Sequence, residues 1–233
     1  MAAHRRRVLV LAGRGRYEDP WHDHAATSYR VALVLRDLGL DVEVRSAFPD
    51  AFDDLQDYDL LVVNSGRGRV DPDFDGADPR WALSHEAVRA FAAAGRPVLG
   101  LHQAANTFAD SEFWEEILGG RWIPGRSMHP PRGHAVFDVC AAHPIVDGLG
   151  PLEALDERYS YLQVRPGSRI LVTQRHDGVD HAVVWVNGTA PYRAVYDGLG
   201  HDVTSYDSPS RRRLLAREAL WLLSADPATV RAV

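Results

Sequence analysis

Three short apolar runs constrain the fold of this chain more than any other feature. They are "RVLVLAG" (7–13), "YDLLVVNSG" (58–66) and "RPVLGLH" (96–102). None of them alternates with polar residues, and such continuous runs are typical of strands that are buried on both faces. Strands of this kind occur in parallel sheets whose two faces are covered by helices.

Periodic segments separate these runs. The segment 26–39 has apolar residues at helical spacing and ends at Gly39, and the segment 85–95 ends at Gly95. Between the first two runs, residues 40–46 alternate with the period of two that is typical of a strand. The order strand, helix, strand, strand, helix, strand indicates βαβ units, and therefore a parallel sheet with helices on both faces.

The second half of the chain has a different pattern. Four strands are expected there, at 134–139, 168–174, 181–187 and 192–198. Their connections are short, which favours antiparallel neighbours or an extension of the first sheet. A closing helix is expected at 208–225, with Ser208 as its N-cap and Pro209 at its first position. No linker-like stretch divides the chain, so we expect one α/β domain over residues 1–233.

Composition excludes several classes of protein. The chain has 233 residues and a net charge of −6, and its basic residues are spread along it, which is unlike a nucleic-acid-binding surface. No stretch reaches the ~20 apolar residues of a membrane span. The run Val8–Ala12 is shorter than the ~7–15 residues of a signal-peptide core. Cys140 is the single cysteine, which excludes an internal disulfide and suits a reducing compartment. We expect a cytoplasmic protein with a small-molecule substrate and no membrane or nucleic-acid partner, and homo-oligomerisation is left open.

Polar residues gather where the predicted strands end. In open α/β sheets, ligands bind outside the carboxyl ends of the strands. The loops at these ends, 13–24, 64–71, 102–105 and 198–202, carry His22, His24, Asn64, Ser65, His102, Gln103 and His201. A single histidine is commonly a hydrogen-bonded structural residue, but several histidines that converge indicate acid–base chemistry or metal binding.

The residues of these loops raise two kinds of ligand, a divalent metal ion and a phosphate group. Zinc accepts three histidines, so His22, His102 and His201 are candidate ligands of a divalent metal, although the H-E-x-x-H pattern is absent. The run "GRGR" occurs at 13–16 and 66–69, but neither copy fits a dinucleotide or P-loop pattern. The indication of a phosphate or dinucleotide site is therefore weak.

A further motif, "LDERYSYL" (155–162), brings Asp156, Glu157 and Tyr159 together. On spacing alone it favours a solvated turn. In a cleft, the same groups would bind sugar hydroxyls or orient a histidine. Aromatic residues near the loops would pack against sugar faces: Tyr17, Trp21, Trp81, Trp114, Trp122, Tyr159 and Tyr161. Of these, we expect Trp114 and Trp122 to fill the core instead.

The ordered motifs resemble a known family. "DPWHDH", "YDLLVVN", "GRPVLGLHQAA", "FWEEILGG", "HAVFDVCAAHPIVDGL", "LDERYSYL" and "YRAVYDGLGHD" follow one another in the order of the ThuA-like family, from about residue 7 to 223. This family is named for trehalose utilisation and is similar in fold to class I glutamine amidotransferases. The resemblance implies a flavodoxin-like, doubly wound sheet with an elbow after the fourth strand. In the amidotransferases that elbow bears the catalytic cysteine, whereas here it bears His102, so cysteine-dependent glutamine hydrolysis is not expected.

The resemblance also implies a role in the metabolism of disaccharides such as trehalose and of their keto forms. The recurrent family positions correspond to His22, His102, His143, Asp156, Glu157, Tyr159, Gly200 and His201. The first hypothesis is a sugar-modifying enzyme with His102, His201 and Glu157 as catalytic residues, and with a substrate site made of His22, His24, Gln103, Asn64, Asp156 and Tyr159. The second is a metal-dependent hydrolase in which the three histidines hold a divalent ion such as zinc. The third is a carbohydrate-binding module without catalysis.

Overall fold

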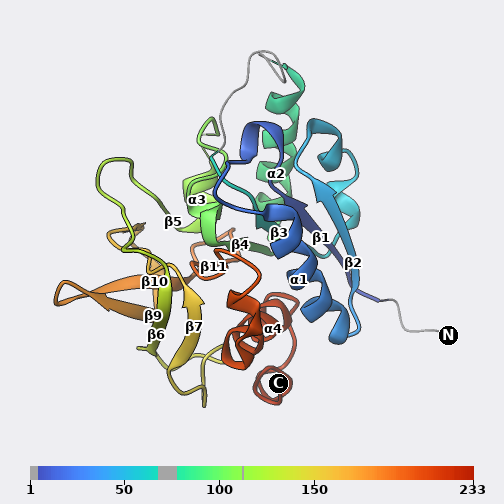
Figure 1. Ribbon diagram of the computed structural model, residues 1–233. Helices are drawn as coiled ribbons and strands as arrows, with labels where there is room; N and C mark the ends of the chain where they lie inside the picture. The colour runs from blue at the N-terminus through green and yellow to red at the C-terminus, as the bar shows by residue number, and fades with distance from the viewer. Residues whose placement is uncertain (1–4, 68–77, 112) are drawn as a thin grey trace.

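A nine-stranded sheet runs through the molecule (Figure 1). The computed structural model describes residues 5–67, 78–111 and 113–233. The strand order is β2-β1-β3-β4-β11-β10-β9-β6-β7. The strands are β1 (Arg7–Ala12), β2 (Asp41–Ser46), β3 (Leu60–Asn64), β4 (Val98–Leu101), β6 (Gly133–Val139), β7 (Leu152–Asp156), β9 (Ser168–His176), β10 (Val179–Asn187) and β11 (Ala194–Asp197). Two short strands, β5 (Gly120–Arg121) and β8 (Gln163–Val164), pair separately.

The first five strands in this order are parallel to one another. Their order, β2-β1-β3-β4-β11, is that of flavodoxin-like folds, with the topological switch between β1 and β3. Every residue of β3 and β4 is buried. The three apolar runs therefore form a parallel sheet, as predicted, because helices exclude water from both of its faces.

Helices cover the two faces in pairs. On one face lie α1 (His24–Asp37) and α4 (Pro209–Leu222), which contact each other (Figure 1). On the other lie α2 (Arg80–Ala93) and α3 (Trp114–Leu118), whose buried residues belong to a second apolar cluster. A short α5 (Pro227–Arg231) packs on α4, and 3₁₀ turns occupy Gly15–Tyr17, Pro49–Phe52, Leu55–Asp57, His102–Ala105 and Ser205–Asp207.

Capping side chains set the ends of two helices. Ser208 accepts a hydrogen bond from the Arg211 N–H, which confirms it as the N-cap of α4. In α1 the helix begins at His24, two residues before the predicted start, because Asp23 accepts from the Ala26 N–H. Gly39 follows α1 with a φ of +79°, in the left-handed region that favours glycine after a helix.

The antiparallel half extends the sheet from β11. This strand pairs with β4 in parallel and with β10 in antiparallel fashion, so it belongs to both halves. The strand β7 was not predicted, and it pairs along β6 with Gly133 opposite Asp156. The expectation of a solvated turn at 155–162 is therefore wrong for its functional residues. Asp156, Glu157 and Tyr159 are 0%, 6% and 3% exposed, because β7 carries them into the interior.

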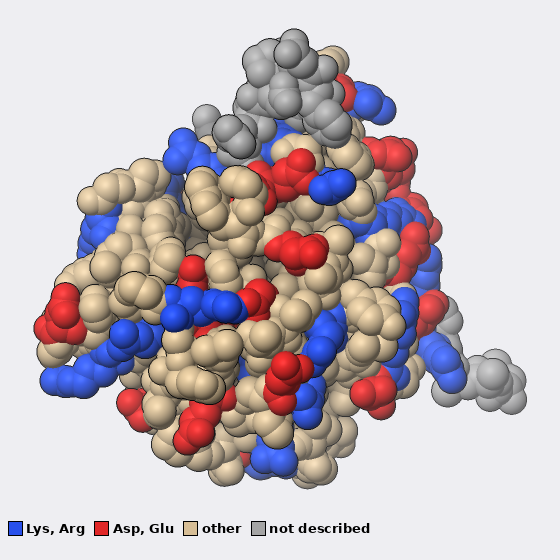
Figure 2. All heavy atoms as spheres, in the orientation of Figure 1, with Lys and Arg blue, Asp and Glu red and all other residues tan. Residues whose placement is uncertain are grey.

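The surface shows no dominant charge. On the face drawn in Figure 2, acidic and basic side chains are interspersed and neither kind forms a continuous patch. Among the helices of the described residues, none combines the length and the apolar character that crossing a bilayer requires.

A buried ion pair joins the sheet to α4. Arg211 Nη1 lies 2.8 Å from Asp197 Oδ2, and both side chains are 0% exposed. Arg211 also donates to the Leu199 carbonyl, and Asp197 accepts from the Leu199 N–H. The pair thus fixes the chain at Leu199, where it leaves β11.

We expect Arg211→Met to lower the free energy of unfolding by about 3–5 kcal/mol, because it leaves the Asp197 carboxylate buried without its cation. Urea denaturation measures this change. The control is Arg14→Met, since Arg14 pairs with Glu18 at the surface and exposed pairs contribute at most about 1 kcal/mol. Equal effects of the two substitutions would contradict the structural role of the buried pair.

Candidate functional site

The turn after β4 presents His102 at the carboxyl edge of the sheet. His102 has a φ of +46°, a left-handed conformation that costs a non-glycine residue of order 1–3 kcal/mol. Gly100 makes room for this turn and for α3, since a Cβ on it would lie 3.1 Å from Ala104 Cβ and 2.5 Å from Leu118 Cδ1. Two hydrogen bonds hold the histidine: its Nδ1 lies 2.8 Å from the Gly198 carbonyl, and Tyr196 donates to its backbone oxygen. Because a carbonyl can only accept, Nδ1 carries the proton and Nε2 points toward the site.

The loop after β1 brings a second imidazole to the same point. His22 Nδ1 lies 2.8 Å from Asp19 Oδ1, and its Nε2 lies 3.2 Å from His102 Nε2. Burial raises the pKa of Asp19, but hydrogen bonds from His22, the Trp21 N–H and Gln103 outweigh it and hold that pKa at about 2. Asp19 is therefore a carboxylate at neutral pH and accepts from His22 Nδ1–H. The Nε2 atoms of two histidines thus face each other with their lone pairs.

Glu157 and His201 complete the group from β7 and from the loop after β11. Glu157 Oε2 lies 3.4 Å from His102 Nε2, and Glu157 Oε1 lies 3.3 Å from His201 Nδ1. The neighbouring Asp156 positions this second loop, because it accepts from the Gly200 and His201 N–H groups and from the Ser205 hydroxyl. Gly200 has a φ of +119°, which glycine adopts readily and other residues rarely adopt. In this conformation its N–H points at Asp156.

The side chains shift one another's pKa values. Burial lowers the pKa of His22, assisted by the neighbouring histidines. For His102 burial also acts downward, but the Glu157 contact and the charge of Asp156 outweigh it and raise its pKa. Burial acts upward on Glu157, yet contacts with His102 and His201 hold its pKa well below the usual range. The pKa of Tyr159 is raised well above 10 by burial, so its phenol keeps its proton. The site thus contains a carboxylate, a phenol and three imidazoles.

A cavity of about 440 Å³ opens on this group. We call it the histidine cavity. It is lined by Trp21, His22, Gln103, Asn106, Trp122, His129, Glu157, Tyr159 and His201. Trp21 stands on its rim with 75% of the residue exposed. His102 itself does not line the cavity, but Tyr159, which does, has its Oη 3.0 Å from His102 Nε2.

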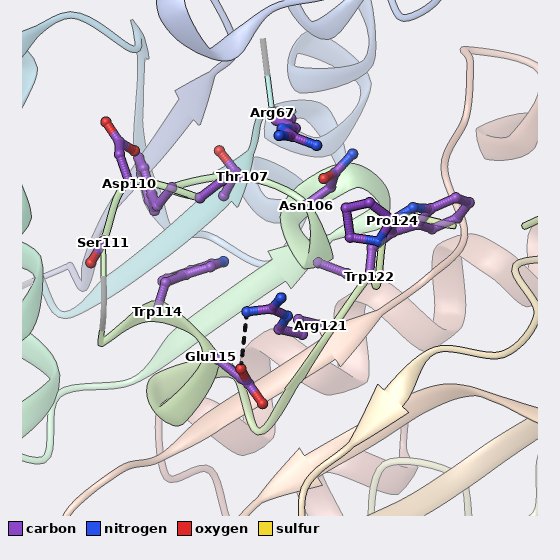
Figure 3. A pocket seen from close by; sticks show the side chains of 13 residues that line it. Arg67, Asn106, Thr107, Asp110, Ser111, Trp114, Glu115, Arg121, Trp122 and Pro124 are labelled. Carbon is purple, nitrogen blue, oxygen red and sulfur yellow. Dashed lines mark hydrogen bonds and ion pairs between the residues drawn. The ribbon is translucent and has the colours of Figure 1, made fainter. Parts of the chain in front are cut away.

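A second cavity of about 420 Å³ adjoins the first and shares Asn106 and Trp122 with it. Figure 3 shows this second cavity, in which Arg121 and Glu115 form an ion pair on one wall. It holds no histidine. Trp122 and Asn106 therefore contribute to the walls of both cavities.

Some predicted site residues lie outside the cavity. His24 is buried behind His22, with ring centroids 5.7 Å apart, and burial lowers its pKa to about 4. Asn64 donates to Thr27 and Ser28 and ties the end of β3 to α1, and Ser65 bonds to Thr107. These side chains support the loops and do not line the site.

Two further sequence expectations concern His143 and the second "GRGR" loop. His143 accepts from the Ile145 N–H and packs edge-on against Trp221, which agrees with a structural turn at "HP". Of the second "GRGR" loop, residues 68–71 lie outside the described residues.

Sequence reasoning missed several members of the site. Asp19 and His129 were not singled out, although His129 Nδ1 lies 3.4 Å from Glu157 Oε1. Trp114 is buried as expected, whereas Trp122 packs against the same apolar cluster but is only partly buried and also lines both cavities. Asp19 follows an Asp-x-x-His spacing, which could have indicated a carboxylate that orients His22.

Comparison with known proteins identifies the family. The family model described as "Trehalose utilisation" matches residues 7–222. The chain belongs to the ThuA family. Among curated proteins, no sequence match was found.

Solved structures support the fold of this ThuA-family chain. ThuA-like proteins from Parabacteroides merdae and Bacteroides uniformis superpose with TM-scores of 0.76 and 0.75, at 18% and 17% identity. The alignments cover 96% and 98% of this chain and 91% and 95% of theirs. A glutamine amidotransferase from Thermotoga maritima is more distant, with a TM-score of 0.55 at 14% identity over 98% of this chain and 90% of that protein. The ThuA chain therefore shares its fold with proteins of the amidotransferase type.

The contacts of Asp156 predict a positioning role in the ThuA chain. We expect Asp156→Ala to lower the free energy of unfolding by about 2–3 kcal/mol, because three backbone N–H groups and a hydroxyl lose their buried acceptor. Urea denaturation measures the loss. Asp138→Ala is the control, since Asp138 is exposed on β6 and should change stability by about 0.5 kcal/mol or less. An Asp156 variant as stable as this control would contradict the role.

Proposed function

We propose that this ThuA-family chain is a cytoplasmic enzyme that acts on a carbohydrate in the histidine cavity, with His102, His201 and Glu157 as its reacting groups. One observation carries the proposal. The cavity combines tryptophan walls, Trp21 and Trp122, with a floor of titratable groups. Apolar sugar faces pack on aromatic rings, while sugar hydroxyls need hydrogen-bonding partners in the same pocket.

The floor offers the donors and acceptors that a sugar requires. Tyr159 keeps its proton and donates it to His102 Nε2, so its oxygen can accept a hydrogen bond from a sugar hydroxyl. Glu157 is ionised and accepts from hydroxyl groups. His201 lies beside Glu157 and lines the cavity, so it is placed to take a proton from a bound hydroxyl or from a carbon next to a carbonyl.

The adjoining cavity supports a substrate of more than one ring. It meets the histidine cavity at Trp122 and Asn106, and each cavity exceeds 400 Å³ in volume. A disaccharide would place one ring over the histidines and the other beyond Trp122. The description of the family as one of trehalose utilisation agrees with a substrate of this size.

Incubation with a panel of disaccharides and their keto forms, followed by NMR of the products, tests the proposal. We expect turnover of at least one sugar, and we expect Glu157→Gln to lower kcat/KM by at least about 100-fold, within the range that a positioned acid or base contributes. His134→Ala is the matched control, because His134 is exposed on β6 and should keep full activity.

Two results would contradict this proposal. Full activity in Glu157→Gln would remove Glu157 from the reaction. Calorimetric binding of a sugar with no product from any member of the panel would favour a binding module over an enzyme.

The exposed ring of Trp21 predicts a separate effect on affinity. Stacking of this kind contributes about 0.5–1.5 kcal/mol, so Trp21→Ala should weaken sugar binding about 2- to 12-fold with little change in Tm. Isothermal titration calorimetry measures the affinity. Tyr29→Ala is the control, since Tyr29 is 57% exposed on α1 and does not line the cavity. An unchanged affinity in Trp21→Ala would show that this ring does not contact the sugar.

A further inference from the structure

We propose that His22, His102, Glu157 and His201 bind one divalent metal ion, of which Zn²⁺ fits the ligand types best. Each residue offers one ligand atom, and the four atoms lie within 4.8 Å of one another. Three imidazoles and one carboxylate suit zinc, whereas Mg²⁺ and Ca²⁺ prefer oxygen ligands. The proposal rests on the proposed function only for the use of the ion, because metal binding itself requires no substrate.

The separations of the ligand atoms match a coordination sphere. With bonds of about 2.1 Å, two ligands of a tetrahedral zinc ion lie roughly 3.4 Å apart. The distance between His22 Nε2 and His102 Nε2 is 3.2 Å, and that between His102 Nε2 and Glu157 Oε2 is 3.4 Å. His201 Nδ1 lies 3.3 Å from the other oxygen of Glu157. The pairs His22–His102 and His102–Glu157 are thus already spaced as ligands of one ion, and His201 lies next to the same carboxylate.

In His22 and His102, the ring nitrogen that faces away from the cluster, Nδ1, is held as it is in metal-bound histidines. Metal-bound histidines commonly donate their other ring N–H to a carboxylate or a backbone carbonyl, which fixes the tautomer and the ring orientation. His22 does this with Asp19, and His102 does it with Gly198. The Nε2 atoms of both histidines therefore face each other with their lone pairs.

A proton does not satisfy this cluster as a metal ion would. A proton on His102 Nε2 can be given to only one of its three neighbours, which are His22, Glu157 and Tyr159. Within the described part of the chain, Glu157 Oε2 and His201 Nδ1 are buried and make no hydrogen bond, and Glu157 is only 6% exposed. Unpaired buried polar groups are costly, and a single cation would satisfy all four ligand atoms together.

The ion would remain accessible to a ligand. His22, Glu157 and His201 line the histidine cavity, so the group opens toward it on one side. A sugar hydroxyl or carbonyl oxygen that enters the cavity would reach this side, where a metal acts as a Lewis acid. The inference therefore favours substrates that present such an oxygen beside Tyr159.

Metal binding is tested on the untagged full-length protein without any sugar. After removal of metal with a chelator, titration with Zn²⁺ is followed by calorimetry and by elemental analysis of the dialysed protein. We expect one equivalent of zinc in the wild type and a loss of at least 100-fold in affinity in His22→Ala and in His102→Ala. Asp19→Asn should weaken binding 10- to 100-fold, because it removes the carboxylate that orients His22.

His176→Ala is the control and should bind one equivalent, since His176 lies at the end of β9 and outside the group. Circular dichroism and thermal unfolding show which variants are folded, and Glu157→Gln, which keeps the size of the side chain, provides a second variant of the group. Failure of the wild type to bind Zn²⁺, or equal binding in His22→Ala, Glu157→Gln and the wild type, would overturn the metal site. Stoichiometric zinc without turnover of any sugar would contradict the proposed function and leave the metal site supported.

Discussion

The site depends on two hydrogen bonds that fix the Nδ1 atoms of His22 and His102. Asp19 holds His22 and the Gly198 carbonyl holds His102, so two Nε2 atoms face each other 3.2 Å apart. The fold brings them together because β1, β4 and β11 end at the same edge of a parallel sheet. The strained turn at His102 and the tight packing at Gly100 serve this one arrangement.

This arrangement accounts for the residue at the turn after β4. The turn presents a side chain at the carboxyl edge of the sheet, with β4 behind it and the 3₁₀ turn His102–Ala105 ahead. The side chain of His102 is turned toward other imidazoles and a carboxylate. Cys140, the single cysteine, is exposed just beyond β6 and does not line the cavity.

The parallel half of the fold could be predicted because its strands are buried on both faces and read as plain apolar runs. The caps at Ser208 and Gly39 followed from local chemistry in the same way. The strand β7 was missed, because it is only five residues long and has no continuous apolar run. The convergence of His22, His102 and His201 followed from the rule about strand ends. The Asp-x-x-His spacing could have indicated the role of Asp19. The parts played by His129 and Trp122 depend on distances across the cavity, which no local pattern encodes.

Anomalous X-ray diffraction at the zinc absorption edge, from crystals of the untagged protein grown with Zn²⁺, tests the central claim most directly. The account predicts one strong peak between His22 Nε2 and His102 Nε2, within about 2.0–2.2 Å of both atoms and of the Glu157 carboxylate. A map in which these side chains keep their positions with no anomalous peak between them would contradict it.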